Sequence, residues 1–310
     1  MFLLSENLKR IKEITQEAAF FANKAKNGLH YNYDEKTIFS LIYTGQIISL
    51  LKSDLSLAPH LILRGIWEEE ITLKIEKILL KNKPITIFDV GANFGWYGLV
   101  LSRFNTESDI HFFEANPNLI KNLENTMRLN NLARRSKINN LIISDNNDSY
   151  KALHVPNKLQ GSASIDINKL QNSLDYFYED DRKNIESFSI ETKTLDKYSS
   201  ENKIEKVDFM KIDVEGHEEN VLLGSKNIIK LSGQLIVLME WNIGSYSNNL
   251  KCCLDLFNFI YYVSENGNLK DITDIKNKSN HINQMEQIII EKMKVTDAFF
   301  NCLLSKRKLI

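Results

Sequence analysis

The chain has 310 residues, of which 43% are hydrophobic and 25% are charged, and its formal net charge is −1. This length and apolar content suit one large α/β domain with an attachment, or two modest domains. The near balance of charge argues against a nucleic-acid binder, which usually carries a basic excess on one face. The short basic run from Ser305 to Lys308 is interpreted as a solvated tail.

Features that report on cellular location point to the cytoplasm. The order of segments at the N-terminus is wrong for a signal peptide, because Glu6 interrupts the first apolar residues and basic residues follow them. The longest apolar stretch, residues 38–51, contains several polar residues and is too short to cross a bilayer. The three cysteines show no spacing that suits zinc and are interpreted as free thiols in a reducing compartment.

The first 83 residues are predicted to form a helical N-terminal region. Apolar residues recur at helical spacing from Leu4 to Phe21, and residues 37–52 ("TIFSLIYTGQIISLLK") are interpreted as a second helix. Residues 66–83 ("IWEEEITLKIEKILLKNK") predict a third helix, which closes before Pro84. Two roles stay open for this region, namely substrate choice and oligomerisation through its helices.

Residues 84–310 are predicted to form a doubly wound α/β domain with a mainly parallel sheet. Short β-rich runs alternate with helical stretches, and the first run, "ITIFDV", is apolar throughout, as a strand buried on both faces should be. The later runs are "DIHFFEA", "KINNLIIS", "VDFMKIDV", "QLIVLMEW" and, near the C-terminus, "DAFFNCLLS", which we expect to re-enter the sheet. Asn266 and Gly267 between β-rich flanks predict a two-residue hairpin turn.

One segment, residues 146–194, breaks this alternation and is interpreted as a substrate-side insertion. It contains a predicted strand ("YKALHV"), a loop of small residues ("GSAS") and an aromatic group formed by Tyr176, Phe177 and Tyr178. These aromatic residues are expected either to cover a sugar or to pack one face of a helix on the core.

The segment "FDVGANFGWYG", residues 88–98, predicts a ligand-binding turn at the carboxyl end of the first strand. The strand ends at Asp89, and the chain then turns through Gly91, Ala92, Asn93 and Gly95 into a helix. Glycine permits close approach of the backbone to a ligand, and asparagine tolerates positive φ better than most residues. In open α/β sheets, ligands bind at this edge.

Glu114, at the end of the second strand, indicates that the ligand contains a ribose. An acid about twenty residues after the glycine turn can accept hydrogen bonds from both ribose hydroxyls, although a surface role for Glu114 stays open. The glycine spacing is G-x-x-x-G, without the middle glycine that admits the pyrophosphate of a dinucleotide. A ligand with a ribose and no phosphate, S-adenosylmethionine (SAM), therefore fits better than NAD.

The same segments resemble the FkbM-type SAM-dependent methyltransferases. Besides "FDVGANFGWYG", the resemblance rests on "FFEANPNLIKNLENTMRLNN", "IISD", "GSASI", "TLD" and "VDFMKIDVEGHEENVLLG", over residues 64–241. It implies a seven-stranded class I methyltransferase fold and, as the usual activity, O-methylation of a hydroxyl on a sugar or another small molecule. Trp67 and Glu68 resemble a family position near the cofactor pocket, and Ser144 and Asp145 are expected near the adenine.

The "KIDVEGHE" turn is predicted to carry the catalytic residues. Asp213, Glu215 and His217 crowd the end of the fourth strand, at the same edge of the sheet as Gly91. We expect His217 to take the proton of the acceptor hydroxyl, with Asp213 or Glu215 either orienting it or contacting the cofactor's amino group. The alternatives are that the two acids only cap the next helix and that the histidine is structural.

Three further alternatives are weighed against this interpretation. Asp213, Glu240 and His217 could bind magnesium, but their spacing matches no known ligand pattern, so no metal is predicted. The intact turn, the acid and "KIDVEGHE" argue against a catalytically silent cofactor-binding or interaction module. The missing middle glycine argues against a nicotinamide-dependent oxidoreductase.

Overall fold

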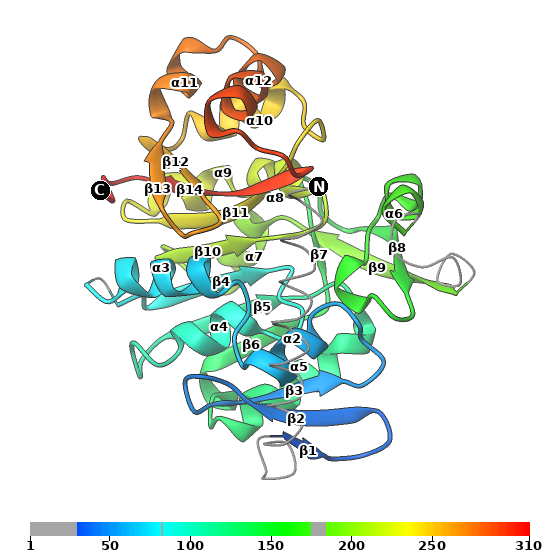
Figure 1. The fold of residues 1–310 in the computed structure, drawn as a ribbon. Helices are drawn as coiled ribbons and strands as arrows, with labels where there is room; N and C mark the ends of the chain where they lie inside the picture. The colour runs from blue at the N-terminus through cyan, green and yellow to red at the C-terminus, as the bar shows by residue number, and fades with distance from the viewer. Residues whose placement is uncertain (1–29, 82, 175–183) are drawn as a thin grey trace, which may run out of the picture.

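The computed structural model describes residues 30–81, 83–174 and 184–310, and its centre is an eight-stranded sheet in the order β13-β12-β14-β11-β10-β4-β5-β6 (Figure 1). The strands are β4 (Thr86–Val90), β5 (Asp109–Phe113), β6 (Ser136–Asn139), β10 (Phe209–Ile212), β11 (Ile236–Asn242), β12 (Phe259–Val263), β13 (Leu269–Asp271) and β14 (Phe299–Ser305). Pairing is parallel from β11 to β6, and β14 is antiparallel to both β11 and β12. The doubly wound, mainly parallel sheet is thus confirmed, with β13 as an eighth strand beyond the seven expected.

Two hydrophobic cores lie on opposite faces of this sheet. Successive side chains of β11 alternate between them: Ile236 and Leu238 belong to one core, and Val237 and Met239 belong to the other. The first core is covered by α2 (Ala58–Arg64), α3 (Glu69–Leu79), α4 (Trp96–Leu101) and α5 (Pro117–Leu129). The second is covered by α7 (Leu195–Glu201), α8 (Glu218–Leu223), α9 (Lys226–Leu231), α10 (Asn248–Leu254), α11 (Thr273–Lys278) and α12 (Ile282–Met293).

The expected third strand, "KINNLIIS", is in fact two strands in two sheets. β6 ends at Asn139, and β7 (Ile142–Ile143) leaves the central sheet and pairs in parallel with β9 (Ile185–Lys193). The break occurs where the Asn140 side chain donates hydrogen bonds to the carbonyls of Glu114 and Ala115. β9 also pairs with β8 (Ser149–Pro156), which contains the predicted "YKALHV" strand.

The residues between β8 and β9 form the rest of the expected insertion. They include the 3₁₀ helix η2 (Gln160–Ser162) and the helix α6 (Ile167–Leu174). Another 3₁₀ helix, η1 (Ala133–Arg135), lies outside the insertion and precedes β6. Tyr176, Phe177 and Tyr178 lie outside the described residues.

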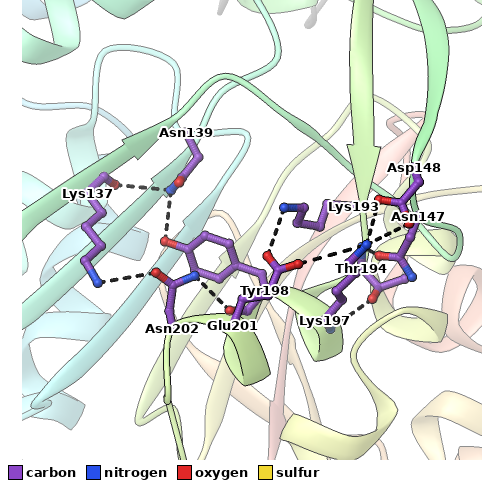
Figure 2. A network of polar contacts seen from close by, with 10 residues as sticks. All are labelled: Lys137, Asn139, Asn147, Asp148, Lys193, Thr194, Lys197, Tyr198, Glu201 and Asn202. Carbon is purple, nitrogen blue, oxygen red and sulfur yellow. Dashed lines mark hydrogen bonds and ion pairs between the residues drawn. The ribbon is translucent and has the colours of Figure 1, made fainter.

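Helix α7 joins the small sheet to the central one (Figure 2). On one side, Tyr198 accepts a hydrogen bond from Asn139 of β6 at 3.2 Å. On the other side, Lys197 forms an ion pair with Asp148, just before β8, and Lys193 of β9 forms one with Glu201. These contacts fix the insertion against the carboxyl edge of the central sheet.

The helix expected over residues 37–52 is wrong, because this segment forms a β-hairpin. β1 (His30–Asn32), β2 (Thr37–Leu41) and β3 (Ile47–Leu51) make a three-stranded antiparallel sheet that lies beside α5 at the bottom of Figure 1. Gly45 has a φ of 81° in the connection, which favours glycine and ends a helix rather than continuing it. The third expected helix is confirmed as α3, and the first, from Leu4 to Phe21, lies outside the described residues.

Two smaller expectations are also corrected. The predicted two-residue hairpin turn between β12 and β13 has three residues, because Ser264 bonds Asn268 across the loop and Gly267 takes a φ of 66°. The sequence from about His217 to Lys230 also predicts one helix, but this helix is interrupted between α8 and α9 at Gly224, where a Cβ would lie 2.0 Å from the carbonyl oxygen of Ser144. The C-terminal "DAFFNCLLS" run does re-enter the sheet, as β14 between β11 and β12.

Candidate functional site

A cavity of about 660 Å³ lies at the carboxyl ends of the parallel strands. Its walls come from the turns after β4, β5 and β10, from Glu240 in β11, from the segment around α2, and from η2 in the insertion. The location agrees with the rule that open α/β sheets bind ligands outside the carboxyl ends of their strands.

The turn after β4 has the geometry that its glycines predict. Gly91, Asn93 and Gly95 all have positive φ, at 74°, 52° and 84°. A Cβ on Gly91 would lie 1.7 Å from the carbonyl oxygen of Asp213, so only glycine fits between the ends of β4 and β10. Gly91, Ala92 and Asn93 line the cavity, whereas Gly95 packs against the side chain of Leu123.

Two buried carboxylates, Asp89 and Glu114, hold this turn in place through hydrogen bonds to backbone N–H groups. Asp89 accepts the backbone N–H of Gly98 at 2.9 Å, which fixes the start of α4 against β4. Glu114 accepts the N–H of Asn93 at 2.6 Å with one oxygen and the N–H of Asn116 at 2.7 Å with the other. Burial raises the pKa of each carboxyl to about 7.

The site fits an adenosyl ligand. Each oxygen of Glu114 retains a free lone pair on a side chain that lines the cavity, so it can accept ribose hydroxyls. The Oδ1 atom of Asn93 is buried and has no hydrogen-bond partner among the described residues. Since buried polar atoms normally find partners, this atom suits a donor group of the ligand.

The structure places the two residues expected near adenine relative to the cavity, and their contact with adenine stays a prediction. Ser144 is buried and its hydroxyl contacts the Nε2 atom of His217 at 3.0 Å, while Asp145 is exposed, and neither lines the cavity. The wall beside Glu114 is formed instead by the apolar residues Leu141, Ile142 and Ile143. The flat face of a base can pack on such a wall.

The expected catalytic residues Asp213, Glu215 and His217 all line the cavity. The ring of His217 bonds Ser144 and, at 3.5 Å, the ammonium of Lys151, while Asp213 forms an ion pair with Lys211 at 3.0 Å. Burial and the charge of Lys151 lower the pKa of His217 to about 4. The lowered pKa weakens His217 as a base near neutral pH.

Lys211 and Glu240 were not predicted to act together, and both line the cavity. Burial alone would lower the pKa of Lys211, but the carboxylates of Asp213, Glu68 and Glu240 outweigh burial and raise it. Glu240, at the end of β11, has its pKa raised well above the ordinary value by burial and by the charge of Asp213. Within the described part of the chain, no group of three or more histidine, cysteine, aspartate or glutamate residues could hold a metal ion.

Trp67 and Glu68 also line the cavity, where the resemblance placed them. Glu68 accepts a hydrogen bond from the hydroxyl of Tyr97 at 2.6 Å, and it adopts a φ of 43°, unusual for a residue with a side chain.

The sequence signalled Lys211 only as a charge inside a strand expected to be buried. It gave no signal for Gln160, which lines the cavity from η2.

Comparisons with known proteins identify the family. The family model described as "Methyltransferase FkbM domain" matches residues 89–268. No curated protein matches the chain.

Solved structures that resemble the chain include several methyltransferases. An O-methyltransferase from Bacillus cereus in complex with SAH is 11% identical, with 77% of this chain and 82% of that chain covered and a TM-score of 0.39. A SAM-dependent O-methyltransferase from Thermotoga maritima is 12% identical, with 87% and 78% covered and a TM-score of 0.37. An O-methyltransferase from Streptomyces achromogenes, involved in tomaymycin synthesis and in complex with SAM, is 8% identical, with 77% and 81% covered and a TM-score of 0.34.

The family match extends from Asp89, at the start of the ligand-binding turn, past the "KIDVEGHE" turn and beyond β12. It therefore includes the glycine turn, Glu114, and the three residues expected to be catalytic, and it confirms the family and the cofactor that the sequence indicated. The chain belongs to the FkbM methyltransferase family and is a SAM-dependent methyltransferase.

Proposed function

We propose that the protein is an O-methyltransferase that acts on a hydroxyl of a sugar, a glycan or another small-molecule acceptor. The observation that carries this proposal is the extent of the cavity beyond the glycine turn. Past Gly91 it continues along the ends of β10 and β11 to Glu240, and its far wall includes Trp67 and Phe299. Carboxylates can accept hydrogen bonds from sugar hydroxyls, and aromatic rings can pack on the apolar faces of a sugar ring.

The charge of the cavity wall favours a neutral acceptor. The lining contains the acids Glu68, Asp89, Glu114, Asp213, Glu215 and Glu240, whereas Lys211 is the one lysine or arginine that the described residues contribute to it. An acceptor that carries phosphate would be repelled by this wall, and a nucleic acid would lack the cationic contacts on which its binding depends. A polyhydroxyl compound meets neither obstacle.

The cofactor is proposed to lie across the turn after β4. Glu114 would accept the ribose hydroxyls, Asn93 Oδ1 would accept a donor of the cofactor, and the backbone at Gly91 and Ala92 would pack against it. When bound, SAM supplies an electrophilic methyl group. The protein's task is then to orient the acceptor oxygen and to remove its proton.

Two residues are candidates for the group that takes this proton. His217 was expected from the sequence, but its low pKa makes it a weak base and its Nε2 atom is engaged by Ser144 and Lys151. Glu240 lines the cavity, and the nearby carboxylates of Asp213 and Glu215 increase its affinity for a proton. We favour Glu240, with Asp213 and Lys211 fixing the charge around it.

The proposed function is tested by binding and by transfer. Isothermal calorimetry should show binding of SAM and SAH and no binding of NAD. Incubation with methyl-labelled SAM and a panel of neutral sugars, sugar phosphates and oligonucleotides should label a neutral sugar. Labelling confined to phosphorylated or nucleic-acid acceptors would overturn the proposal.

The choice of base is tested with the acceptor that this panel identifies. Glu240→Gln should lower turnover by roughly two to four orders of magnitude, the usual contribution of a general base, whereas His217→Asn should lower it far less. SAH affinity should change little in both variants. The opposite order of turnover would return the role to His217.

The proposed location is the cytoplasm. Among the residues described, no helix has the length and apolar character needed to cross a membrane. All three cysteines are free, and Cys252 is also exposed, which suits a reducing compartment.

A further inference from the structure

A chain of buried hydrogen bonds connects the N-terminal region to Glu114. Asp54 is 1% exposed, and it accepts the N–H groups of Leu57 and Ala58 at the start of α2, both at 2.9 Å. Its other oxygen accepts the backbone N–H of Gln160 in η2 at 3.1 Å. One carboxylate therefore fixes two segments that are more than a hundred residues apart in the sequence.

Gln160 continues the chain toward the cofactor side. The carbonyl oxygen and the side-chain oxygen of Gln160 both accept from the Nδ2 atom of Asn116, at 3.1 and 2.9 Å. The backbone N–H of Asn116 in turn donates to Glu114 at 2.7 Å. Gln160 and Asn116 are 4% and 0% exposed, so solvent does not compete for these bonds.

A second contact joins the same insertion to the glycine turn. A Cβ on Gly161 would lie 2.6 Å from the Nδ2 atom of Asn93. The backbone of η2 thus packs directly on the residue whose buried Oδ1 atom has no partner among the described residues. The insertion, which is predicted from the sequence to serve the acceptor, therefore contacts both residues proposed to bind the cofactor: Asn93 directly, and Glu114 through Asn116.

We propose that Gln160 is a positioning residue for the cofactor: by joining the Asp54 turn to Asn116, it holds Glu114 in place to receive the ribose. The inference rests on the proposed placement of the cofactor. It implies that the insertion contributes to SAM binding and does not serve the acceptor alone.

Calorimetry with SAH tests this inference without an acceptor. Gln160→Ala removes the side-chain bonds to Asn116 and to the carbonyl of Asn157, and should weaken SAH binding about tenfold. The matched control is Gln46→Ala. Gln46 also donates its side-chain amide, to the carbonyl of Leu99 and to Ser102, but it lies outside the cavity lining. This control should lower the melting temperature and leave SAH affinity unchanged.

The pH dependence of SAH affinity separates positioning from general support of the fold. The bond from Asn116 lowers the pKa of Glu114 against burial, while the charges of Asp213 and Asp89 oppose its ionisation. Loosening Asn116 should therefore move the midpoint of the pH profile upward in Gln160→Ala and leave it in place in Gln46→Ala.

The outcomes distinguish this inference from the proposed function. A wild-type protein that does not bind SAH would overturn both. Wild-type binding with unchanged affinity and pH midpoint in Gln160→Ala would overturn the inference alone. Equal losses of affinity in Gln160→Ala and Gln46→Ala would also overturn it, since the effect would then be general destabilisation.

Discussion

At the scale of single residues, the site combines carboxylates that are costly to ionise with a ligand that carries positive charge. Asp89 and Glu114 are buried, and burial raises the pKa of each to about 7. Lys211 and the backbone N–H groups of the turn offset only part of this cost. The ammonium group that SAM and SAH share, and ribose hydroxyls that donate to Glu114, would favour the ionised form, so binding of either ligand and ionisation of the site should be coupled.

Glu114→Gln should test this coupling directly. The substitution keeps the size of the side chain but removes the charge that accepts the ribose hydroxyls, and it should weaken SAH binding by about 1.5–3 kcal/mol. In the wild-type protein, affinity should fall as pH falls below about 7, where Glu114 takes up a proton, and the variant should lose most of this dependence. Calorimetry from about pH 6 to pH 8.5 measures both effects.

Asp148→Asn is the matched control, because Asp148 is an exposed carboxylate that pairs with Lys197 (Figure 2) and does not line the cavity. Its SAH affinity should equal that of the wild type at every pH. If Glu114→Gln and Asp148→Asn behaved alike, Glu114 would not be the ribose ligand.

His217 gives a prediction about stability, because its pKa is shifted in the direction opposite to that of Glu114. Its pKa is lowered in the folded protein, from 6.5 to about 4, so the unfolded chain takes up the proton first as pH falls. Stability that is present above pH 6.5 should be lost as pH falls toward 4, and this one group should account for roughly 3 kcal/mol. Urea unfolding at pH 7 and at pH 4.5 should show a smaller acid loss in His217→Asn than in the wild type. Equal acid losses would contradict the buried, neutral histidine.

The sequence predicted the site unevenly, and the reason is physical. Asp89, Asn93 and Glu114 follow from the order of strand, turn and strand, because local sequence decides that order. Gln160 depends on how an insertion packs against a distant turn, which no local pattern encodes. His217 was placed correctly in the cavity wall, but its pKa depends on Lys151, a residue contributed by β8.

At the scale of elements, the central strands were predictable and the N-terminal hairpin was not. The inner parallel strands β4, β5, β10 and β11 are apolar runs bounded by turns, and they are largely buried on both faces as such runs require, whereas the edge strand β6 is polar and only partly buried. In β2, Ile38 and Ser40 point inward while Phe39 and Leu41 are more exposed, so apolar residues occupy both faces. The alternation of polar and apolar residues that marks a half-buried strand was therefore missing, and the length of the apolar segment favoured a helix.

The 3₁₀ helix η2 offers a prediction about how closely the insertion must pack. Gly161→Ala places a methyl group against Asn93, and displacing this side chain should weaken SAH binding by about 1–2 kcal/mol with little change in melting temperature. Gly233→Ala is the control, because a Cβ there would meet no atom within 4 Å. Calorimetry and thermal melting of both variants decide the matter. Unchanged affinity in Gly161→Ala would show that Asn93 tolerates displacement.

At the scale of the whole molecule, the N-terminal region and the methyltransferase sheet share one core. Ile48 and Leu50 of β3 and Leu61 of α2 are fully buried in the same cluster as Leu99 of α4 and Leu123 of α5. Ser49 of β3 also bonds Asn122 and Thr126 of α5. The described part of the N-terminal region, residues 30–81, therefore shares a continuous core with the sheet, and we infer that it unfolds together with the methyltransferase domain.

Leu50→Ala tests this inference. Leu50 is fully buried, so its truncation should cost about 2–5 kcal/mol. If the core is continuous, the loss should shift a single unfolding transition of the entire protein, seen alike by near-ultraviolet circular dichroism and by tryptophan fluorescence, which reports on Trp96 in one core and on Trp241 in the other. SAH affinity at a temperature where the variant is folded should stay unchanged, because Leu50 is outside the cavity lining.

Leu73→Ala, at a position 42% exposed, is the control and should change stability by less than about 0.5 kcal/mol. Two separate transitions in Leu50→Ala, with only the earlier one shifted, would show instead that the N-terminal region is an independent unit attached to a self-sufficient methyltransferase domain.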